Sequence, residues 1–330
     1  MAESRATVVT PDVIPRSAAE RDDRPLAGIG LMAVGVSSLP LMDGIAKYLS
    51  AEYHVLQIAW ARYLFHLLIL IGLLAGRLTW RALWPEQPAL QLVRSGFLLA
   101  TTLCYFGAVS YLPLADVLTL AFIGPIVSTA LAPVALGEYV GPARWGAVIV
   151  GFVGALIVIR PGLAVFHWAS LLALGAGISY GAYLLATRRL SGSGRPLVTL
   201  LHTAGLGVVV LSALLPVVWR SPTPSAWAWM IAMGALGAVA HFFIIRAFEY
   251  ASAPAVAPVS YTEIVAATAV GWAAFGDLPD RWTWAGVSII VASGIFISFR
   301  EGHARRVRVI PASDAGMPNQ TGRHSNARVH

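Results

Sequence analysis

The 330-residue chain is strongly apolar: 57% of its residues are hydrophobic, 12% are charged, and its mean hydropathy is +0.71. Soluble globular chains carry roughly 25% charged residues. A single soluble core cannot hide this much apolar surface, whereas a lipid bilayer accepts it. The formal net charge of +7 sits largely in the two ends and the loops, without a basic stripe interleaved with aromatics. It therefore indicates contact with an anionic membrane surface rather than with nucleic acid.

Ten stretches are apolar and long enough to cross a bilayer, which takes about 20 helical residues. They cover residues 27–49, 55–76, 90–111, 113–136, 143–160, 168–188, 197–219, 226–249, 253–276 and 281–299. Only helices satisfy every backbone N–H within such a segment, so the sequence predicts an all-α integral membrane protein. The polar ends, residues 1–26 and 301–330, are predicted to be disordered tails.

Arginine counts predict the orientation of these spans. Ten spans place both termini on one side, and fifteen arginines lie in the tails, connectors and span flanks of that side, without counting the distant Arg323 and Arg328. The connectors of the other side hold only Arg160, Arg220 and Arg281. Because positively charged loops stay in the cytoplasm, we expect a multi-pass protein of a bacterial inner membrane with both termini cytoplasmic.

The chain also contains an internal repeat. A shift of 139 residues aligns 105–160 with 244–299 without a gap, although only nine of the 56 positions are identical. A Gly-acid pair ends both the fourth and the ninth span, and a tryptophan opens both the fifth and the tenth. Each half has five spans, and because five is odd the second half must be inverted relative to the first. Inverted repeats recur in secondary transporters.

Charged side chains within the spans are the first candidates for a site, because each costs roughly 2.5–3.5 kcal/mol at the bilayer centre on insertion scales. Glu263 is the deepest acid, about 15 Å into its span. It is either a substrate or proton site or a buried structural acid. Asp43 and Lys47 share a helix face, and Arg62 lies at a similar depth. These three either contact the substrate or form an ion-pair clamp, Asp43–Lys47 or Asp43–Arg62, between neighbouring helices.

Aromatic, histidine, proline and glycine residues complete the candidate set. The further binding candidates are Tyr105, Tyr180, Tyr261, His202 and His241. Pro-interrupted spans at matching places in two halves are a sequence pointer to a transport site. The helix-kink and cavity candidates in spans four and nine are Gly124, Pro125, Pro254 and Pro258. The histidines have no metal-ligand spacing, and ordinary membrane-helix kinks remain the alternative for the prolines.

Several chemistries have no sequence support. The chain has no Walker A loop and no HExxH, GxSxG or CxxC motif, and its one cysteine is Cys104. We therefore expect no cofactor, no metal site and no enzymatic activity. Ala147, Gly151 and Ala155 form a small-xxx-small ridge that suits either scaffold packing or a homodimer contact.

Two stretches resemble a known family. The segment YLPLADVLTLAFIGPIVSTALAPVALGE with RWGAVIVGFVGALIVIRPG resembles the first repeat of EamA-type transporters in the drug/metabolite transporter superfamily. The segment APAVAPVSYTEIVAATAVGWAAFGDLPDRWTWAGVSIIVASGIFISFRE resembles the second. The resemblance implies EamA-like repeats at residues 27–160 and 161–300, around a central cavity lined mainly by spans one, three, four, six, eight and nine.

The function expected from this resemblance is secondary transport of a small metabolite or drug-like solute by alternating access. A gradient of H+ or of another coupling ion would drive it. A passive channel is the alternative, and an intramembrane enzyme is a more distant one, because the chain has no filter sequence and no recognised catalytic spacing.

Overall fold

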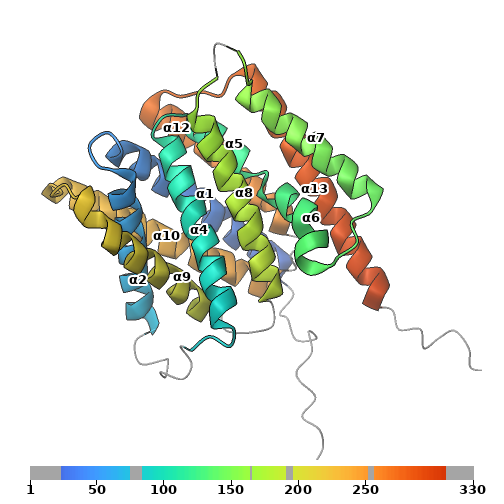
Figure 1. Ribbon diagram of the computed structural model, residues 1–330, viewed down its shortest axis with the longest axis horizontal. Helices are drawn as coiled ribbons and strands as arrows, with labels where there is room; N and C mark the ends of the chain where they lie inside the picture. The colour runs from blue at the N-terminus through green and yellow to red at the C-terminus, as the bar shows by residue number, and fades with distance from the viewer. Residues whose placement is uncertain (1–23, 75–83, 164–165, 191–195, 252–255, 310–330) are drawn as a thin grey trace, which may run out of the picture.

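The computed structural model describes residues 24–74, 84–163, 166–190, 196–251 and 256–309, and every regular element in them is a helix (Figure 1). In chain order the elements are α1 (Pro25–Leu49), α2 (Val55–Leu74), α4 (Pro88–Val109), α5 (Leu114–Ala121), α6 (Gly124–Leu136), α7 (Pro142–Ile159), α8 (Ala169–Arg189), α9 (Pro196–Leu214), η1 (Leu215–Val217), α10 (Pro224–Tyr250), η2 (Ala257–Tyr261), α12 (Thr262–Phe275) and α13 (Arg281–Val309).

Nine spans within the described residues are long and apolar enough to cross a membrane, with α5 and α6 together forming one of them. The ninth predicted span, residues 253–276, contains the short 3-10 helix η2 and the 14-residue helix α12, neither of which is long enough to count among these nine. One predicted boundary is wrong: α13 continues to Val309, beyond the expected start of the tail at residue 301. Residues 1–23 and 310–330, which hold most of both predicted tails, lie outside the described residues.

The 139-residue repeat is visible in the backbone. Helices α7 and α13 begin at Pro142 and Arg281, which are 139 residues apart. Gly137 and Gly276 end α6 and α12 in the left-handed conformation, with φ of 67° and 73°. Glycine adopts this conformation at little cost and so makes a sharp helix end. The two halves therefore repeat the same local structure at equivalent positions.

The packing of the helices shows the same repeat. Helix α1 packs on α10 as α8 packs on α4, while α2 packs on α9 and α7 on α13. Exchanging the first five spans with the last five leaves this set of contacts unchanged. With an odd number of spans in each half, the fold is two inverted five-helix repeats.

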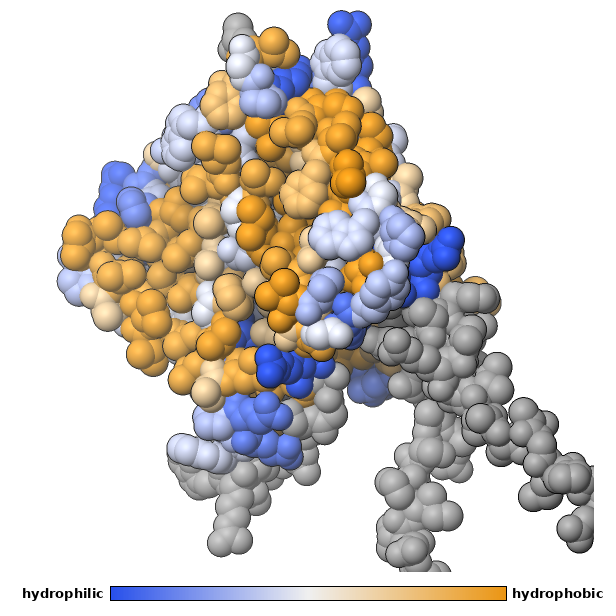
Figure 2. Space-filling view, turned by 45° about the vertical axis from the view of Figure 1, so that its right-hand side comes forward, coloured by the Kyte–Doolittle hydropathy of each residue, from blue (hydrophilic) through white to orange (hydrophobic). Residues whose placement is uncertain are grey.

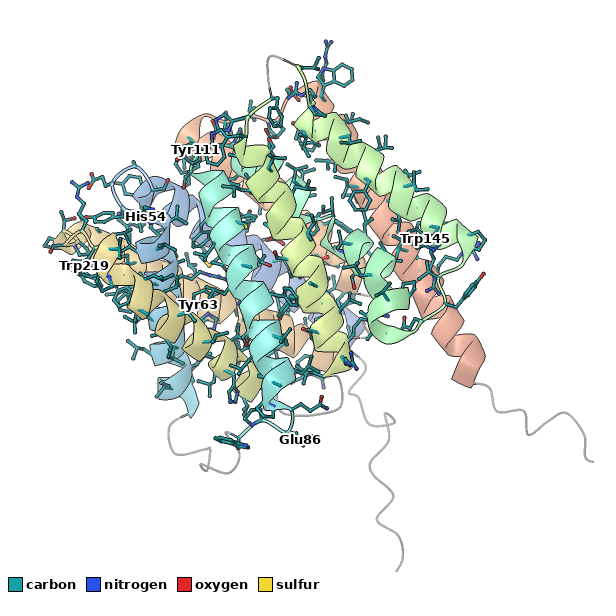
Figure 3. The ribbon with its side chains drawn as sticks, viewed as in Figure 1. His54, Tyr63, Glu86, Tyr111, Trp145 and Trp219 are labelled. Atoms are coloured by element: carbon teal, nitrogen blue, oxygen red, sulfur yellow. The ribbon has the colours of Figure 1, made fainter. Side chains whose placement is uncertain are left out.

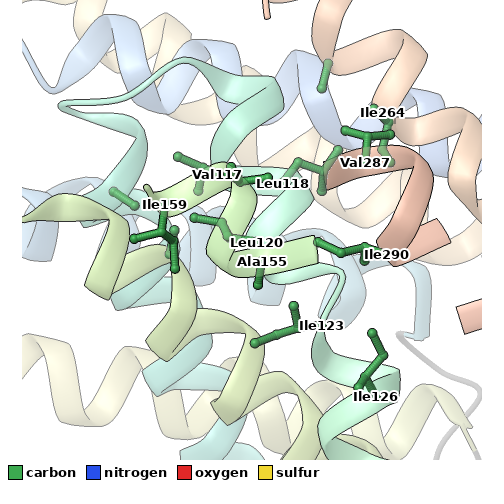
Figure 4. Packing of buried hydrophobic residues seen from close by; sticks show 14 of the residues in the cluster. Val117, Leu118, Leu120, Ile123, Ile126, Ala155, Ile159, Ile264, Val287 and Ile290 are labelled. Carbon is green, nitrogen blue, oxygen red and sulfur yellow. The ribbon is translucent and has the colours of Figure 1, made fainter. Parts of the chain in front are cut away.

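The two largest apolar clusters of the described residues form most of the core. One joins α5, α6, α7, α12 and α13 (Figure 4), and Val117, Ile123, Ile126, Ile264 and Ile290 are each at most 3% exposed in it. The other joins α1, α2, α4, α9 and α10. The small-residue ridge of α7 belongs to the first region, because Gly151 and Ala155 are buried and Ser293 of α13 donates a hydrogen bond to the Ala147 carbonyl at 2.5 Å. The ridge is therefore scaffold within one chain, and it is not free to contact a second copy.

The outer surface is apolar around the sides of the molecule. Figure 2 shows a broad hydrophobic band between hydrophilic patches at its two ends. Large side chains in this band are well exposed, including Val209 at 68%, Val265 at 66% and Ile149 at 62%. Exposed apolar surface of this extent is unfavourable in water but faces lipid chains at little cost. The surface is that of a membrane-embedded protein.

The bundle has two ends, which we name by one residue each. The Lys47 face carries the connections after α1, α4, α7, α9 and α12, and the Arg188 face carries those after α2, α6, α8 and α10. In Figure 3, His54 and Tyr111 mark the Lys47 face, Glu86 marks the opposite end, and Tyr63 lies between them. Positions along the transport path are given below relative to these two faces.

Candidate functional site

Both broken spans have their break in the interior of the span. Helix α5 ends at Ala121, and α6 begins three residues later at Gly124–Pro125. Proline has no N–H to continue the helical bonds. Gly124 lets this break lie against α8, because a Cβ there would be 2.5 Å from Cδ1 of Tyr180. The sequence thus brings an irregular backbone segment into the middle of the bundle.

The second break lies at the equivalent place in the other half. Pro258 lies in η2, and α12 begins at Thr262, so Glu263 occupies the first turn of a half-helix. Carboxylates near a helix N-terminus are favoured by the unpaired N–H groups there. Pro254, the other candidate kink residue of this span, lies outside the described residues.

A cavity of about 290 Å³ opens beside these breaks. It is lined by side chains from both halves of the chain. The lining residues are Leu39, Met42, Asp43, Arg62, Leu98, Thr101, Thr102, Tyr105, Phe106, Leu118, Ala121, Phe122, Tyr180, Tyr183, His241, Ile244 and Glu263. Six of the predicted binding candidates are among them: Asp43, Arg62, Tyr105, Tyr180, His241 and Glu263.

Two carboxyl groups form an acidic side of this cavity. Asp43 on α1 is 5% exposed, and Glu263 on α12 is half-buried. Within the described part of the chain, neither group pairs with a cation within 4.0 Å or accepts a hydrogen bond of regular geometry. The buried hydroxyl of Tyr105 lies close to Asp43, although it makes no hydrogen bond of regular geometry with any described residue. This side of the cavity therefore has unused polar groups.

A guanidinium lies on another wall. Arg62 is 9% exposed, donates from Nη1 to Oγ1 of Thr102 at 2.7 Å, and donates from Nε to Sδ of Met42 at 3.3 Å. Its charge also lies 5.2 Å from the ring centre of Tyr63 and 5.6 Å from that of Phe106. Arg62 is thus held by neutral groups, and the predicted Asp43–Arg62 ion pair is not formed.

Two histidines lie beside Arg62. His241 on α10 lines the cavity, and its Nδ1 is 2.8 Å from the Gly237 carbonyl. The His66 ring on α2 contacts it edge-on at 5.3 Å between centroids. Nε2 of His66 is buried and has no hydrogen-bond partner among the described residues. Arg62 and His241 thus line the same cavity as Asp43 and Glu263.

Three predicted site residues are not in the cavity. Lys47 pairs with Asp277 at 2.6 Å, so the predicted Asp43–Lys47 pair is wrong. His202 faces a separate apolar hollow of about 720 Å³ between α2, α4 and α9. Tyr261 packs on Phe122 at 5.1 Å between ring centroids, and its hydroxyl lies against Gly294 of α13. The position of each of these side chains is set by residues that are distant in sequence. Spacing along the chain did not reveal these contacts.

Arg94 is an interior charge that sequence reasoning placed in a cytoplasmic flank. It is 4% exposed and donates to Thr187 at 2.8 Å, to Thr203 at 2.9 Å and to the Tyr183 hydroxyl at 2.6 Å. These partners lie on α8 and α9, so Arg94 joins the two halves beneath the cavity. Its depth was the missed signal: α4 begins at Pro88, about 9 Å before Arg94.

Two ion pairs occupy equivalent positions at opposite ends of the bundle. Lys47 of α1 pairs with Asp277, which follows the glycine cap of α12. Arg188 of α8 pairs with Glu138 at 3.7 Å, and Glu138 follows the glycine cap of α6. In both caps the acid's N–H donates back to the helix, from Asp277 to Gly271 and from Glu138 to Ala132. The repeat therefore places equivalent ion pairs at the two faces, and the Lys47 face carries in addition the Arg160–Asp280 pair at 2.7 Å.

Comparisons with known proteins agree with this architecture. Residues 26–160 and 167–299 both match the model of the EamA-like transporter family. The chain is 27% identical to a riboflavin transporter of Vibrio cholerae, over 83% of this chain and 93% of that protein. It is 25% identical to an S-adenosylmethionine uptake transporter of Rickettsia conorii (84% and 95% covered) and 26% identical to a pseudopaline exporter of Pseudomonas aeruginosa (82% and 96%). A crystal structure with 20% identity shares the fold, with a TM-score of 0.54 over 84% of this chain and 98% of that one.

Proposed function

Because the chain belongs to the EamA-like transporter family, we propose that it is a secondary transporter that moves a small metabolite or drug-like solute by alternating access. The observation that carries this proposal is the cavity between two inverted halves, with Asp43 contributed by one half and Glu263 by the other. Charged groups inside a membrane protein are expensive and mark solute or ion pathways. A cavity shared by two repeats at their helix breaks is a recurring form of transporter site.

The relatives support a small organic solute and leave the direction of transport open. Their names cite riboflavin, S-adenosylmethionine and pseudopaline, and they include both uptake proteins and an exporter. These solutes differ in charge and shape, so the class of solute has to come from the lining of this chain's own cavity.

The two ion pairs support alternating access. Lys47–Asp277 joins the halves at one face, and Arg188–Glu138 holds the equivalent helix pair at the other. The first is shorter, at 2.6 Å against 3.7 Å, and less exposed. We infer that each pair is a latch that closes its own face, and that the Lys47 face is the more firmly closed one in this structure. Breaking one latch while making the other would expose the cavity to alternate sides.

The arginine distribution supports an orientation. The sequence predicts fifteen arginines for the side that bears both termini and three for the other side, and Arg94, one of the fifteen, lies inside the bundle. By the positive-inside rule the Arg188 face is cytoplasmic, as are both termini, in the inner membrane of a bacterium. The shorter latch, Lys47–Asp277, would then close the extracellular or periplasmic face.

Coupling to a proton gradient is the role proposed for the acidic side of the cavity. Glu263 and Asp43 are the two carboxyl groups that face the cavity and have no cation within 4.0 Å in the described chain. A carboxyl group in this position can accept a proton on one side and release it on the other. Glu263 is the first choice for this role because it lies at a half-helix terminus beside a backbone break.

The test is solute accumulation in proteoliposomes supplied with a metabolite extract and an imposed pH gradient, measured by mass spectrometry. We expect at least one solute to exceed its external concentration, and a protonophore to abolish the excess. Glu263→Gln should remove the effect of the pH gradient, whereas Glu86→Gln, at an exposed position, should not. Solutes that only equilibrate would indicate a channel, and a chemically altered solute would indicate an enzyme.

A further inference from the structure

The charges that face the cavity do not balance. Asp43 on α1 and Glu263 on α12 face it as acids, and Arg62 on α2 is the one guanidinium among the residues that line it. The other titratable groups in the lining are His241 on α10 and the phenols Tyr105, Tyr180 and Tyr183. Leaving histidine aside, the lining therefore holds two acidic side chains against one basic side chain.

Arg62 does not offset the two acids by direct contact. No carboxylate among the described residues lies within 4.0 Å of its guanidinium, which is bound by Thr102 and Met42. Two carboxyl groups that face one cavity shielded from water repel each other when both are ionised. A cation placed between them would lower the cost of both charges at once. The Tyr105 hydroxyl faces the same cavity close to Asp43.

Aromatic rings surround the same space. The rings of Tyr180 and Tyr183 stack, with centroids 5.7 Å apart and an angle of 17° between their planes. The ring centroids of Tyr105 and Phe106 are 6.5 Å apart. The faces of aromatic rings attract cations, most strongly where water is excluded. Carboxyl groups combined with several rings are a suitable environment for an organic ammonium group.

We infer that the transported solute carries a protonated amine, which Asp43 and Glu263 hold between them, with its apolar part against the aromatic wall. The inference rests on the proposed transport function and names its solute class. An inorganic ion fits less well, because the cavity of about 290 Å³ also exposes Leu39, Leu98 and Ile244. In addition, the described residues contain no cluster of three or more His, Cys, Asp or Glu side chains suited to a metal.

Arg62 adds a second requirement to this solute class. Its Nη2 makes no hydrogen bond with the described residues, and it lies on the wall of the same cavity. A hydrogen-bond acceptor on the solute, such as a carboxylate, can use this free donor. A solute with an amine at one end and a carboxylate at the other would therefore match both charged walls.

The test compares four probes that share one phenyl-alkyl body: L-phenylalanine, phenethylamine, 3-phenylpropionate and 3-phenylpropanol. Each is added at equal concentration to the purified protein, and the midpoint of thermal unfolding is measured. We expect the two amines to raise the midpoint by about 2–4 °C, L-phenylalanine by more than phenethylamine, because a ligand that binds only the folded state stabilises it. The anion and the alcohol should have no effect. Sodium and potassium chloride serve as inorganic controls.

Variants assign the effect to the cavity. Asp43→Asn and Glu263→Gln should each reduce the amine-dependent shift at least threefold, whereas Glu86→Gln should retain it. Because a substitution inside the bundle can unfold the chain, each variant is first required to keep the unliganded midpoint of the parent, and Tyr105→Phe provides a milder third variant at the same place. A larger shift from the anion, the alcohol or the inorganic salts than from the amines overturns the inference, as does the absence of any amine-dependent shift.

The solute class and the transport function fail in different ways. If proteoliposomes concentrate an anionic or neutral metabolite, the transport proposal stands and the amine inference is wrong. If they concentrate no metabolite while the amines still stabilise the protein, the binding site stands and active transport is wrong.

Discussion

Lys47 and Asp277 form an ion pair of 2.6 Å that joins the first span to the connection between α12 and α13, 230 residues away in the chain. Nζ of Lys47 also donates to the Leu112 carbonyl at 2.9 Å, so one side chain ties together three segments from both halves. Its Nζ lies 5.0 Å from the centroid of the Phe275 ring. Lys47 therefore holds segments of both halves together at this face.

Asp277→Asn should weaken this closure and change the rate of transport. The partners are 16% and 29% exposed, so the pair is only partly screened by water and is worth about 1–2 kcal/mol. That energy corresponds to a roughly 5–30-fold shift between closed and open states. We expect a changed initial rate in proteoliposomes. The exchanged pair Lys47→Asp with Asp277→Lys should recover most of the parent rate, and a double variant no better than the single ones would contradict the latch.

Glu138→Gln should have a smaller effect of opposite direction. The Arg188–Glu138 distance is 3.7 Å and the side chains are 25% and 42% exposed, so water screens this pair more strongly. Exposed pairs contribute below about 1 kcal/mol. We therefore expect the population of molecules with a closed Arg188 face to change at most fivefold. Double electron–electron resonance between spin labels across that face measures this change. Equal effects of Glu138→Gln and Asp277→Asn on the same face would argue against two separate latches.

Gly276→Ala should lower stability through backbone strain alone. Gly276 has a φ of 73°, and a Cβ there would meet no atom within 4 Å. A side chain in the left-handed conformation costs about 1–2 kcal/mol. The thermal midpoint should fall by a few degrees, and Asp277 should be displaced from Lys47. Gly96→Ala is the matched control, because it is helical and its Cβ also has free space. A similar loss in the control would show that the cap geometry is not the cause.

Arg94→Lys should destabilise the junction between α4, α8 and α9. The planar guanidinium of Arg94 donates hydrogen bonds to three hydroxyl groups at fixed angles, on Thr187, Thr203 and Tyr183. Lysine has one compact ammonium group in its place. Leaving two of these acceptors without their donor costs about 1–3 kcal/mol in the interior. Thermal unfolding of the purified variant measures this loss, and Arg144→Lys, outside the network, should leave the midpoint unchanged. An Arg94→Lys variant with the same unfolding midpoint as the parent would show that the network does not contribute to stability.

The sequence predicts most of the fold because hydrophobic length and helix-end residues are local signals. The predicted span 143–160 is α7, Pro142–Ile159, and the predicted span 55–76 is α2, Val55–Leu74. The repeat was also predictable, because the helix ends at Gly137 and Gly276 are formed locally, by glycines in the left-handed conformation. What local signals did not show was where α13 ends, because its last residues are polar yet remain helical.

The site was only partly predictable, because charge partners are chosen in three dimensions. Depth along a span was sufficient to single out Asp43 and Glu263, which both line the cavity. The helical spacing of Asp43 and Lys47 favoured a pair, but the longer lysine side chain reaches Asp277 on another segment. Arg94 was assigned to a flank because an error of two residues in the helix start concealed its depth.

The most direct test of the central claim is the access of one cavity residue from each face. Thr101 lines the cavity, so Thr101→Cys in a Cys104→Ser background provides a single thiol for an impermeant reagent. Labelling is measured in right-side-out and in inside-out vesicles. We predict labelling from both faces, with Asp277→Asn raising the rate from the Lys47 face and lowering it from the Arg188 face. Labelling from one face only, or rates that rise together from both, would contradict alternating access.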